Sequence, residues 1–348
     1  MQGLHGHRAC LMRCSYEGTT MRLKGAEPFI IVMNAGSGRN GEAEKRAEIE
    51  QAFSDSGRSY ELVAVPGADI PQAAAEAAQQ ARARGAILVA CGGDGTLSAV
   101  AGQAWRHDLP FGILPQGTFN YFGRCYGIPA EMAEAAPLLL RGRIEPVQVG
   151  MVNDILFLVN ASLGLYPDVL EDREAYKQRF GRSRLVALWS GLVTLLRERG
   201  ELVLTLRYGH EDEAAAAHDE RPARVRTIRT PTLVVGNNAL QLEQIGVDGR
   251  PLTRGELVAM AVRPVGTLEM YWLLLRGALS RLGEAEEVSH FGFRQMEVAM
   301  RGRRRVKVAM DGEIHHLPTP LSFAVAPRPL RLVVGADRGD PGAAGRAA

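Results

Sequence analysis

Short apolar runs alternate with longer amphipathic or alanine-rich stretches along the chain up to Arg141. The short runs predict buried strands and the longer stretches predict helices. Strands that alternate with helices in this way indicate a parallel sheet covered by helices on both faces. The expected strands are Phe29–Met33, Tyr60–Val65, the run that begins at Ala86, and Gly112–Leu114; the helices between them run to about Phe53, from Pro71 to near Gly85, and from Leu97 to Trp105.

Beyond Arg141 the pattern changes to many short strands separated by turn residues, which is typical of a β-rich second domain. Two amphipathic helices interrupt it, at Ser183–Arg199 and Gly266–Leu282. Their tryptophans, Trp189 and Trp272, are candidates to line an acyl-chain pocket, the alternative being ordinary core packing. The expected strands are Ile144–Val149, Leu156–Ala161, Leu202–Arg207, Val225–Thr230, Thr232–Gly236, Val258–Arg263, Gln295–Met300, Arg304–Met310 and Leu321–Ala326.

Composition limits the classes of partner. A chain of 348 residues is long enough for two domains with separate cores. A net charge of +2, with 46% hydrophobic and 23% charged residues, describes an ordinary globular protein and gives no reason to expect a nucleic-acid partner. No apolar run approaches the roughly 20 residues that span a bilayer, so we expect any membrane to be met at its surface. Four cysteines without metal-binding spacing favour a reducing, cytoplasmic compartment.

The most informative stretch is Gly92-Gly93-Asp94-Gly95-Thr96, which follows a buried strand and precedes a helix. Glycines let a backbone approach a ligand closely, and the free N–H groups of a helix start favour an anion. A carboxylate in the same turn is compatible with phosphates if it acts through a divalent cation or a water. The alternative is a glycine-rich turn that binds nothing.

Two further loops follow strands of the same predicted sheet. Asn34–Gly41 follows the first strand and Pro115–Tyr121 follows the fourth. Because the carboxyl ends of parallel strands share one edge, we expect all three loops to converge there. In the last of them, Gly117 and Thr118 can offer backbone N–H groups and a hydroxyl to a phosphate; the alternative is a simple capped helix with Thr118 as its N-cap.

One motif supports a competing interpretation. The spacing of Gly36, Gly38 and Gly41 fits the dinucleotide pattern G-x-G-x-x-G, and Glu61 lies about twenty residues on. This leaves an NAD(P)-binding enzyme open as an alternative. A phosphate-binding P-loop is excluded, because Glu42 stands where the lysine of that motif is needed.

The candidate chemistry of the second domain lies at Asp311-Gly312-Glu313. If this segment is extended, the two carboxylates share one face and could accept a hydroxyl proton during phosphoryl transfer. The alternative is an ordinary Asp-Gly hairpin turn. The basic stretch Arg301–Lys307 just upstream is explained either by a charged strand edge or by attraction to phosphates and anionic lipid headgroups.

With these loops in place, the chain resembles the diacylglycerol kinase catalytic-domain family. That family includes bacterial soluble lipid kinases, sphingosine kinases and ceramide kinases, and is distantly related to NAD kinases. Gly92–Thr96 matches its G-G-D-G-T signature in full. Weaker matches are Asn34–Gly38 to N-P-x-S-G, Gly112–Asn120 to G-x-x-P-x-G-T-x-N, Phe157–Gly164 to F-x-N-x-x-x-x-G, Val235–Asn237 to x-G-N, and Asp311–Glu313 to D-G-E.

The resemblance implies an N-terminal three-layer α/β nucleotide-binding domain and a C-terminal β-sandwich. We expect a disordered extension at residues 1–20, the ATP-binding domain at 21–146 with a return segment 318–336, the β-rich lipid-substrate domain at 147–317, and a disordered tail at 337–348. The implied ATP-binding residues are Asn34, Ser37, Gly92, Gly93, Asp94, Gly95, Thr96, Gly117, Thr118 and Asn120.

The resemblance also implies a reaction. Asp311 would be the general base, with Glu313 its neighbour, and Asp94 would hold the Mg²⁺ that accompanies ATP. The γ-phosphate would pass to a lipid hydroxyl, diacylglycerol or a related lipid, at the inner face of a membrane. The implied partners are therefore ATP, a lipid and a membrane surface. Oligomeric state stays open, with a homodimer as one option.

The chain departs from the family pattern at several positions. Tyr121 replaces an acidic residue, Ser98-Ala99 replaces Asn-Glu, Gln148 replaces a common Asp, and Arg254 replaces the Asp of a D-G-x-L motif that is associated with a structural Mg²⁺ in some bacterial members. These losses keep a second possibility open, namely a non-catalytic sensor of nucleotide or lipid on the same fold.

Overall fold

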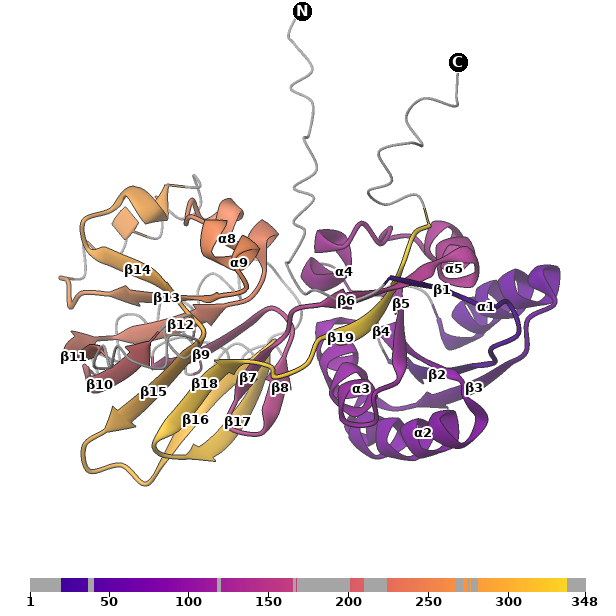
Figure 1. Ribbon diagram of the computed structural model, residues 1–348, viewed down its shortest axis with the longest axis horizontal. Coiled ribbons are helices and arrows are strands. Elements are labelled where there is room, and N and C mark those ends of the chain that lie inside the picture. The colour runs from indigo at the N-terminus through magenta and orange to yellow at the C-terminus, as the bar shows by residue number, and fades with distance from the viewer. Residues whose placement is uncertain are drawn as a thin grey trace, which may run out of the picture.

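The computed structural model describes residues 20–36, 41–117, 120–164, 201–209, 224–266 and 281–336, with the isolated residues Pro167, Glu269, Trp272, Leu273 and Arg276. These residues form two domains that lie side by side along the long axis of the molecule (Figure 1). The first is an α/β domain and the second is built mainly of strands, as the pattern of apolar positions predicts.

A seven-stranded sheet organises the first domain, in the order β1-β6-β19-β5-β4-β2-β3. The four strands β3, β2, β4 and β5 are parallel, β19 joins β5 in parallel, and β6 runs antiparallel to β19 and β1. The strand bounds are β1 Met21–Arg22, β2 Phe29–Asn34, β3 Tyr60–Val65, β4 Ile87–Gly92, β5 Pro110–Pro115, β6 Arg143–Val147 and β19 Leu330–Val334.

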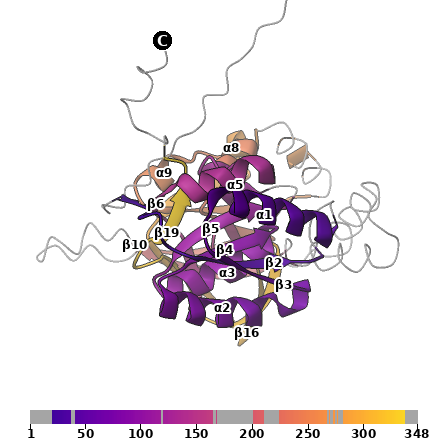
Figure 2. The same ribbon diagram turned by 90° about the vertical axis from the view of Figure 1, so that its right-hand side faces the viewer.

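Helices cover both faces of this sheet (Figure 2). Helices α1 and α5 pack together on one face, and α2 and α3 pack together on the other. Glycines in the left-handed conformation end two of them, Gly57 after α1 and Gly85 after α2. The bounds are α1 Glu42–Ser56, η1 Gly67–Asp69, α2 Ile70–Arg84, α3 Asp94–Arg106, α4 Tyr121–Cys125 and α5 Met132–Arg141.

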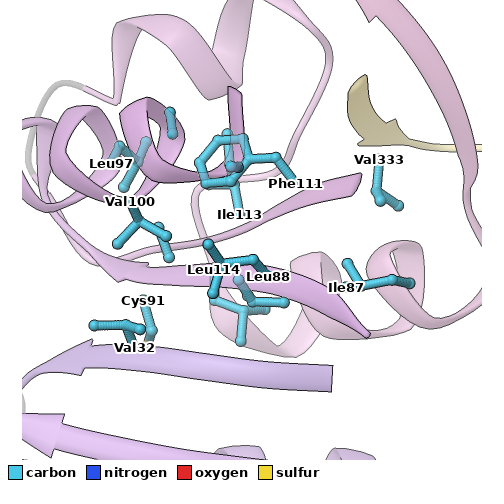
Figure 3. Close-up of a cluster of buried hydrophobic side chains, with 14 of the residues drawn as sticks. Val32, Ile87, Leu88, Cys91, Leu97, Val100, Phe111, Ile113, Leu114 and Val333 are labelled. Atoms are coloured by element: carbon cyan, nitrogen blue, oxygen red, sulfur yellow. The ribbon is translucent and has the colours of Figure 1, made fainter. Parts of the chain in front are cut away.

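Helix α3 is held against the sheet by a continuous apolar layer (Figure 3). Leu97 and Val100 of α3 are fully buried, as are Phe111 of β5 and Leu88 of β4. Packing of this kind fixes the position of a helix closely, because protein interiors are as dense as organic crystals. The first turn of α3 therefore has a defined place at the carboxyl edge of the sheet.

Two six-stranded antiparallel sheets form the second domain, in the orders β11-β10-β15-β18-β7-β8 and β14-β13-β12-β9-β16-β17. Buried side chains from both sheets make one core. The bounds are β7 Gly150–Val152, β8 Ile155–Phe157, β9 Asn160–Gly164, β10 Leu202–Gly209, β11 Arg224–Thr230, β12 Thr232–Gly236, α8 Ala239–Gln244, α9 Arg250–Thr253, β13 Leu257–Val262, η3 Leu282–Glu284, β14 Val288–Phe293, β15 Gln295–Met300, β16 Arg305–Met310, β17 Glu313–Pro318 and β18 Leu321–Val325.

The chain passes from the first domain to the second after β6 and comes back after β18. Of the segment 318–336 expected to return, β19 lies in the first sheet between β6 and β5. Strand β18 pairs with β7 and β15 and so lies in the second domain. The tertiary pairing of these two strands is a long-range property that local pattern does not encode.

Several expected boundaries are wrong. The strand expected at Leu156–Ala161 is divided between β8, which ends at Phe157, and β9, which begins at Asn160. The third helix begins at Asp94 and not at Leu97, because Gly93 has extended geometry and acts as the N-cap residue. Ser183–Arg199, most of Gly266–Leu282 and the two expected disordered ends lie outside the described residues; Trp272 is described and is 59% exposed. In the part of the chain that the structure describes, no helix has the length and apolar character needed to cross a bilayer.

A matched pair of substitutions tests whether β19 is an integral strand of the first domain. Val333 is buried in β19 beside Ile144, whereas Val225 on β11 is 59% exposed. We expect Val333→Ala to lower the free energy of unfolding by about 1.5–3 kcal/mol, since a fully buried valine is worth that much. Val225→Ala should cost less than about 1 kcal/mol, within the range of strand propensity. Urea denaturation measures both, and equal losses would contradict the placement of β19.

Candidate active site

The first turn of α3 lies at the centre of the candidate site. Strand β4 ends at Gly92, Gly93 caps the helix, and Asp94 begins it. A Cβ on Gly92 would come within 2.6 Å of Thr96, so this position requires glycine. The backbone N–H groups of the first turn have no partner inside the helix and point towards the carboxyl edge of the sheet. Groups of this kind can bind an anion, and the core holds this helix in place.

Asn34, at the end of β2, joins the first loop to this turn. Its Nδ2 donates to Thr96 Oγ1 at 3.4 Å, and its Oδ1 accepts from the backbone N–H of Gly36 at 3.0 Å. Gly67 approaches the same amide closely, because a Cβ there would lie 3.3 Å from Asn34 Nδ2. The side chain of Asn34 is therefore fixed beside the start of α3.

The loop after β5 packs against the first turn of α3, on the side opposite Asn34. The N–H of Gln116 donates to the carbonyl of Gly92 at 2.9 Å, and a Cβ on Gly117 would lie 3.0 Å from the Cα of Gly93. Asn120 is buried with a positive φ of 46°, and its side chain accepts from the N–H of Gly117 and donates to the carbonyl of the same residue. Asn120 is also the N-cap residue of α4, a place that the alternative interpretation of this loop gave to Thr118.

The second domain contributes the hairpin between β16 and β17. Met310 pairs with Glu313, so Asp311 and Gly312 are the two turn residues, with φ values of 49° and 92°. Positive φ at both positions is what a type I′ turn requires. The expectation of an extended segment with both carboxylates on one face is wrong here, because the turn reverses the chain between them. The Asp-Gly hairpin alternative is the one observed.

The carboxylate of Asp311 is bound by four donors. Its Oδ1 accepts from the N–H groups of Val159 at 2.8 Å and Asn160 at 3.1 Å. Its Oδ2 accepts from the N–H of Leu158 at 2.7 Å and from Ser98 Oγ at 2.5 Å. Three donors belong to the second domain and the fourth to α3 of the first. Asp311 thus fastens the hairpin both to the segment Leu158–Asn160 and to α3.

Negative charge gathers where the two domains meet. The pKa of Asp94 is raised to about 6, first by burial and then by the negative charge of Asp311, while backbone N–H groups of Asn120, Asp94 and Tyr121 offset part of the rise. Asp94 Oδ1 is buried and has no hydrogen-bond partner within the described residues. A buried oxygen of this kind fits a cation or a proton.

The pKa values of Asp311 and of two neighbouring side chains are shifted as well. Burial raises the pKa of Asp311, opposed by its four hydrogen bonds. Burial and the charge of Asp311 raise the pKa of Glu313, whose Oε1 lies over Gly95; a Cβ on Gly95 would come within 2.7 Å of it. Burial lowers the pKa of His315, opposed by Asp311. Two carboxylates from one domain therefore face a third from the other.

The structure brings together most of the residues named from the sequence. Ser37 and Thr118 lie outside the described residues. Sequence reasoning missed Ser98 and the backbone of Leu158–Asn160 as holders of Asp311. Ser98 could have been noticed, since it lies four residues after Asp94 and so on the same face of α3. The residues around the first turn of α3 are Asn34, Gly92, Gly93, Asp94, Gly95, Thr96, Gly117, Asn120, Asp311 and Glu313.

The position associated with a second-domain Mg²⁺ in the family has different chemistry here. Gln148 Nε2 donates to Asn237 Oδ1 at 2.9 Å and to the carbonyl of Glu256 at 3.1 Å, and Arg254 pairs with the Glu256 carboxylate at 3.4 Å. Gln148 Oε1 is buried without a partner in the described part of the chain, but one neutral oxygen beside a guanidinium is a poor ligand set for Mg²⁺. These residues do not fit that metal. In the described ranges no group of three or more His, Cys, Asp or Glu side chains is placed to hold a metal ion.

The site thus combines glycine-rich loops at the carboxyl edge of a largely parallel sheet with a carboxylate hairpin from an antiparallel sandwich. Residues 28–152 match the diacylglycerol kinase catalytic domain. This region of the chain is therefore similar to the catalytic domain of diacylglycerol kinases.

The curated relatives match different lengths of this chain. A diacylglycerol kinase of Bacillus subtilis is 34% identical over 146 residues, which are 41% of this chain and 47% of the relative. An uncharacterised protein of Synechocystis is 27% identical over 254 residues, 71% of this chain and 54% of the relative. The chain spans about half the length of the curated relatives it matches.

Solved structures agree on the fold. A diacylglycerol kinase from Bacillus anthracis superposes with a TM-score of 0.59 at 17% identity, over 89% of this chain and 97% of that chain. A second structure from the same organism gives a TM-score of 0.65 at 18% identity with the same coverage. At this level of identity, the likeness concerns the two-domain architecture.

Asp94→Asn should stabilise the fold at neutral pH. The native pKa of about 6 lies above the ordinary 3.8, so the folded state binds more protons and stability falls as pH rises from about 4 to about 6. Removing the charge should raise the free energy of unfolding by about 2–3 kcal/mol at pH 8 and change it little at pH 4. Urea melts at both pH values measure this, with the exposed Asp154→Asn as control. An equal effect at both pH values would contradict the assignment.

Asp311→Asn should have the opposite effect. The asparagine amide keeps one acceptor oxygen, but its Nδ2 is a donor. It would replace a carboxylate oxygen that accepts two hydrogen bonds, so two donors would be left without an acceptor. We expect a loss of about 2–4 kcal/mol in the free energy of unfolding at pH 8, since each unsatisfied buried donor costs about 1–3 kcal/mol. Urea denaturation measures the loss, and a variant as stable as Asp94→Asn would show that the four-donor arrangement does not form in solution.

Proposed function

We propose that the protein is an ATP- and Mg²⁺-dependent lipid kinase, which transfers the γ-phosphate of ATP to a lipid hydroxyl, with diacylglycerol or a related lipid as acceptor. The observation that carries the proposal is the junction of the two domains: the start of α3 with Asp94 on one side, and the hairpin of Asp311 and Glu313 on the other. Phosphoryl transfer needs phosphate binding and a proton acceptor at the same place.

The nucleotide's phosphates would bind at the carboxyl edge of the first sheet. The free N–H groups at the start of α3 supply an anion site, and the close approach of Gly93 and Gly117 leaves backbone exposed to a ligand. Asn34 and Thr96 lie beside it. The orphaned Asp94 Oδ1 fits the Mg²⁺ that accompanies ATP. Bound there, Mg²⁺ would neutralise charge on the phosphates.

The three carboxylates at the domain junction are not grouped as a metal site by themselves within the described residues, so the cation would arrive with the nucleotide. Asp94, Asp311 and Glu313 would repel triphosphate if nothing balanced them, and each has a pKa raised in part by burial. The acceptor hydroxyl would lose its proton to the Asp311–Glu313 side. Its oxygen forms a bond to the γ-phosphorus while the bond from that phosphorus to the bridging oxygen of ADP breaks.

The lipid would be reached from a membrane surface, here proposed as the cytoplasmic face of the inner membrane. The basic turn before β16 supports this, because Arg301, Arg303, Arg304 and Arg305 are all exposed. Each arginine near an anionic surface contributes about 1 kcal/mol of attraction. Phosphorylated lipid and ADP are the products.

Incubation with γ-labelled ATP, Mg²⁺ and a whole-lipid extract tests the proposal. We expect label in a lipid product, which mass spectrometry identifies, and a loss of at least about 100-fold in turnover for Asp94→Ala, as for loss of a major electrostatic group. The surface variant Asp154→Ala is the matched control.

The other outcomes separate the alternatives. Calorimetric binding of Mg-ATP without transfer to any lipid would favour a non-catalytic sensor, consistent with the departures at Ala99 and Tyr121. Thermal stabilisation by NAD(P) and not by Mg-ATP would favour the dinucleotide-binding alternative. Either result would overturn the kinase proposal.

A further inference from the structure

The hydrogen bonds of Asp311 leave it no free position for a substrate. A carboxylate has about four lone-pair sites, and Asp311 uses two on each oxygen. Three of its donors are backbone N–H groups, which keep their protons at any working pH. The side chain is also only 8% exposed. An acceptor hydroxyl therefore has no direct hydrogen-bonding path to this carboxylate while the four bonds are in place.

The fourth donor is of a different kind. The hydroxyl of Ser98 gives its proton to Asp311 Oδ2 at 2.5 Å and keeps two lone pairs of its own. Ser98 is only half-buried, whereas the backbone donors of Leu158, Val159 and Asn160 are buried. It also lies one helical turn after Asp94, on the same face of α3. Ser98 thus stands between the proposed phosphate site and the buried carboxylate.

We propose that Ser98 is a proton relay: the acceptor hydroxyl donates to Ser98 Oγ, and Ser98 in turn passes its own proton to Asp311 Oδ2. This inference rests on the proposed kinase function. In the step, the acceptor O–H bond breaks and a new O–H bond forms on Ser98, while the former Ser98 O–H bond breaks and one forms on Asp311. The acceptor oxygen bonds to the γ-phosphorus of ATP, and ADP leaves with the electron pair of the broken P–O bond.

The arrangement favours this route over direct transfer to Glu313. Glu313 comes from the same hairpin but is more exposed to solvent than Asp311, and its Oε1 rests on Gly95. A base in contact with water gains less from the surrounding site than a fully buried one. Asp311 instead receives its proton in a dry environment, where burial favours the neutral acid. Relay and base are then supplied by different domains, so the proton path exists only when the two domains are joined at this contact.

Substitutions at Ser98 separate relay from simple positioning. Ser98→Thr keeps the hydroxyl and should retain turnover within a few-fold. Ser98→Ala should lower kcat by about 100-fold or more, the usual contribution of acid–base catalysis, with the KM for ATP changed less than about threefold. Ser98→Asn keeps an N–H donor for Asp311 but cannot take up and pass on a proton, so it should lose as much as Ser98→Ala. Ser289→Ala, remote on β14, is the control for loss of a hydroxyl.

The solvent isotope effect gives a readout that a structural role would not move. Two protons in flight predict a curved dependence of kcat on the deuterium fraction for the native protein and for Ser98→Thr, and a linear one for the residual activity of Ser98→Ala. Wild-type turnover in Ser98→Ala or Ser98→Asn, or a linear dependence in the native protein, would overturn the relay while leaving the kinase proposal intact. A native protein that transfers phosphate to no lipid would overturn both.

Discussion

The architecture of this protein depends on one buried carboxylate. Asp311 lies in a hairpin turn of the second domain, accepts three backbone N–H groups from the start of β9, and accepts a hydroxyl from α3 of the first domain. A buried charge is tolerable only when its lone pairs are satisfied, and here the chain segments that satisfy them come from both domains. The hydrogen bonds that stabilise the buried charge of Asp311 therefore also fix the hairpin against the proposed nucleotide site.

Around this contact the site contains one carboxylate whose hydrogen bonds are complete and one with an oxygen that lacks a partner in the part of the chain that the structure describes. Asp311 is fully bonded, whereas Asp94 has a buried oxygen without a partner in the described ranges and a pKa raised to about 6. An unsatisfied carboxylate costs stability and is retained where a ligand or cation completes it. The first domain thus carries the carboxylate with the unsatisfied oxygen, and the packed layer beneath α3 holds it in position.

The family match and the site cover different parts of the molecule. The matched catalytic domain ends at residue 152, yet the site is completed by Leu158–Asn160 and by the Asp311–Glu313 hairpin, which lie beyond it. At the second-domain position, Gln148 and Arg254 replace acidic residues with neutral and positive groups. The chain thus keeps the two-domain architecture of the solved structures it resembles, while Gln148 and Arg254 place a neutral and a positive side chain at this position.

Local sequence patterns were enough to predict much of the first domain. Apolar periodicity predicted β2 to β5 and α1 to α3 within a few residues, although it did not predict α5 or β19. The glycines around Asp94 indicated a close backbone approach that Gly92 and Gly95 make in the fold. Only tertiary structure decided that β19 enters the first sheet while β18 stays in the second, that Asp311 and Gly312 form a turn, and that Ser98 binds Asp311. Periodicity and turn chemistry are read over a few neighbouring residues. The Ser98–Asp311 contact joins positions 213 residues apart, and only the packing of two domains selects it.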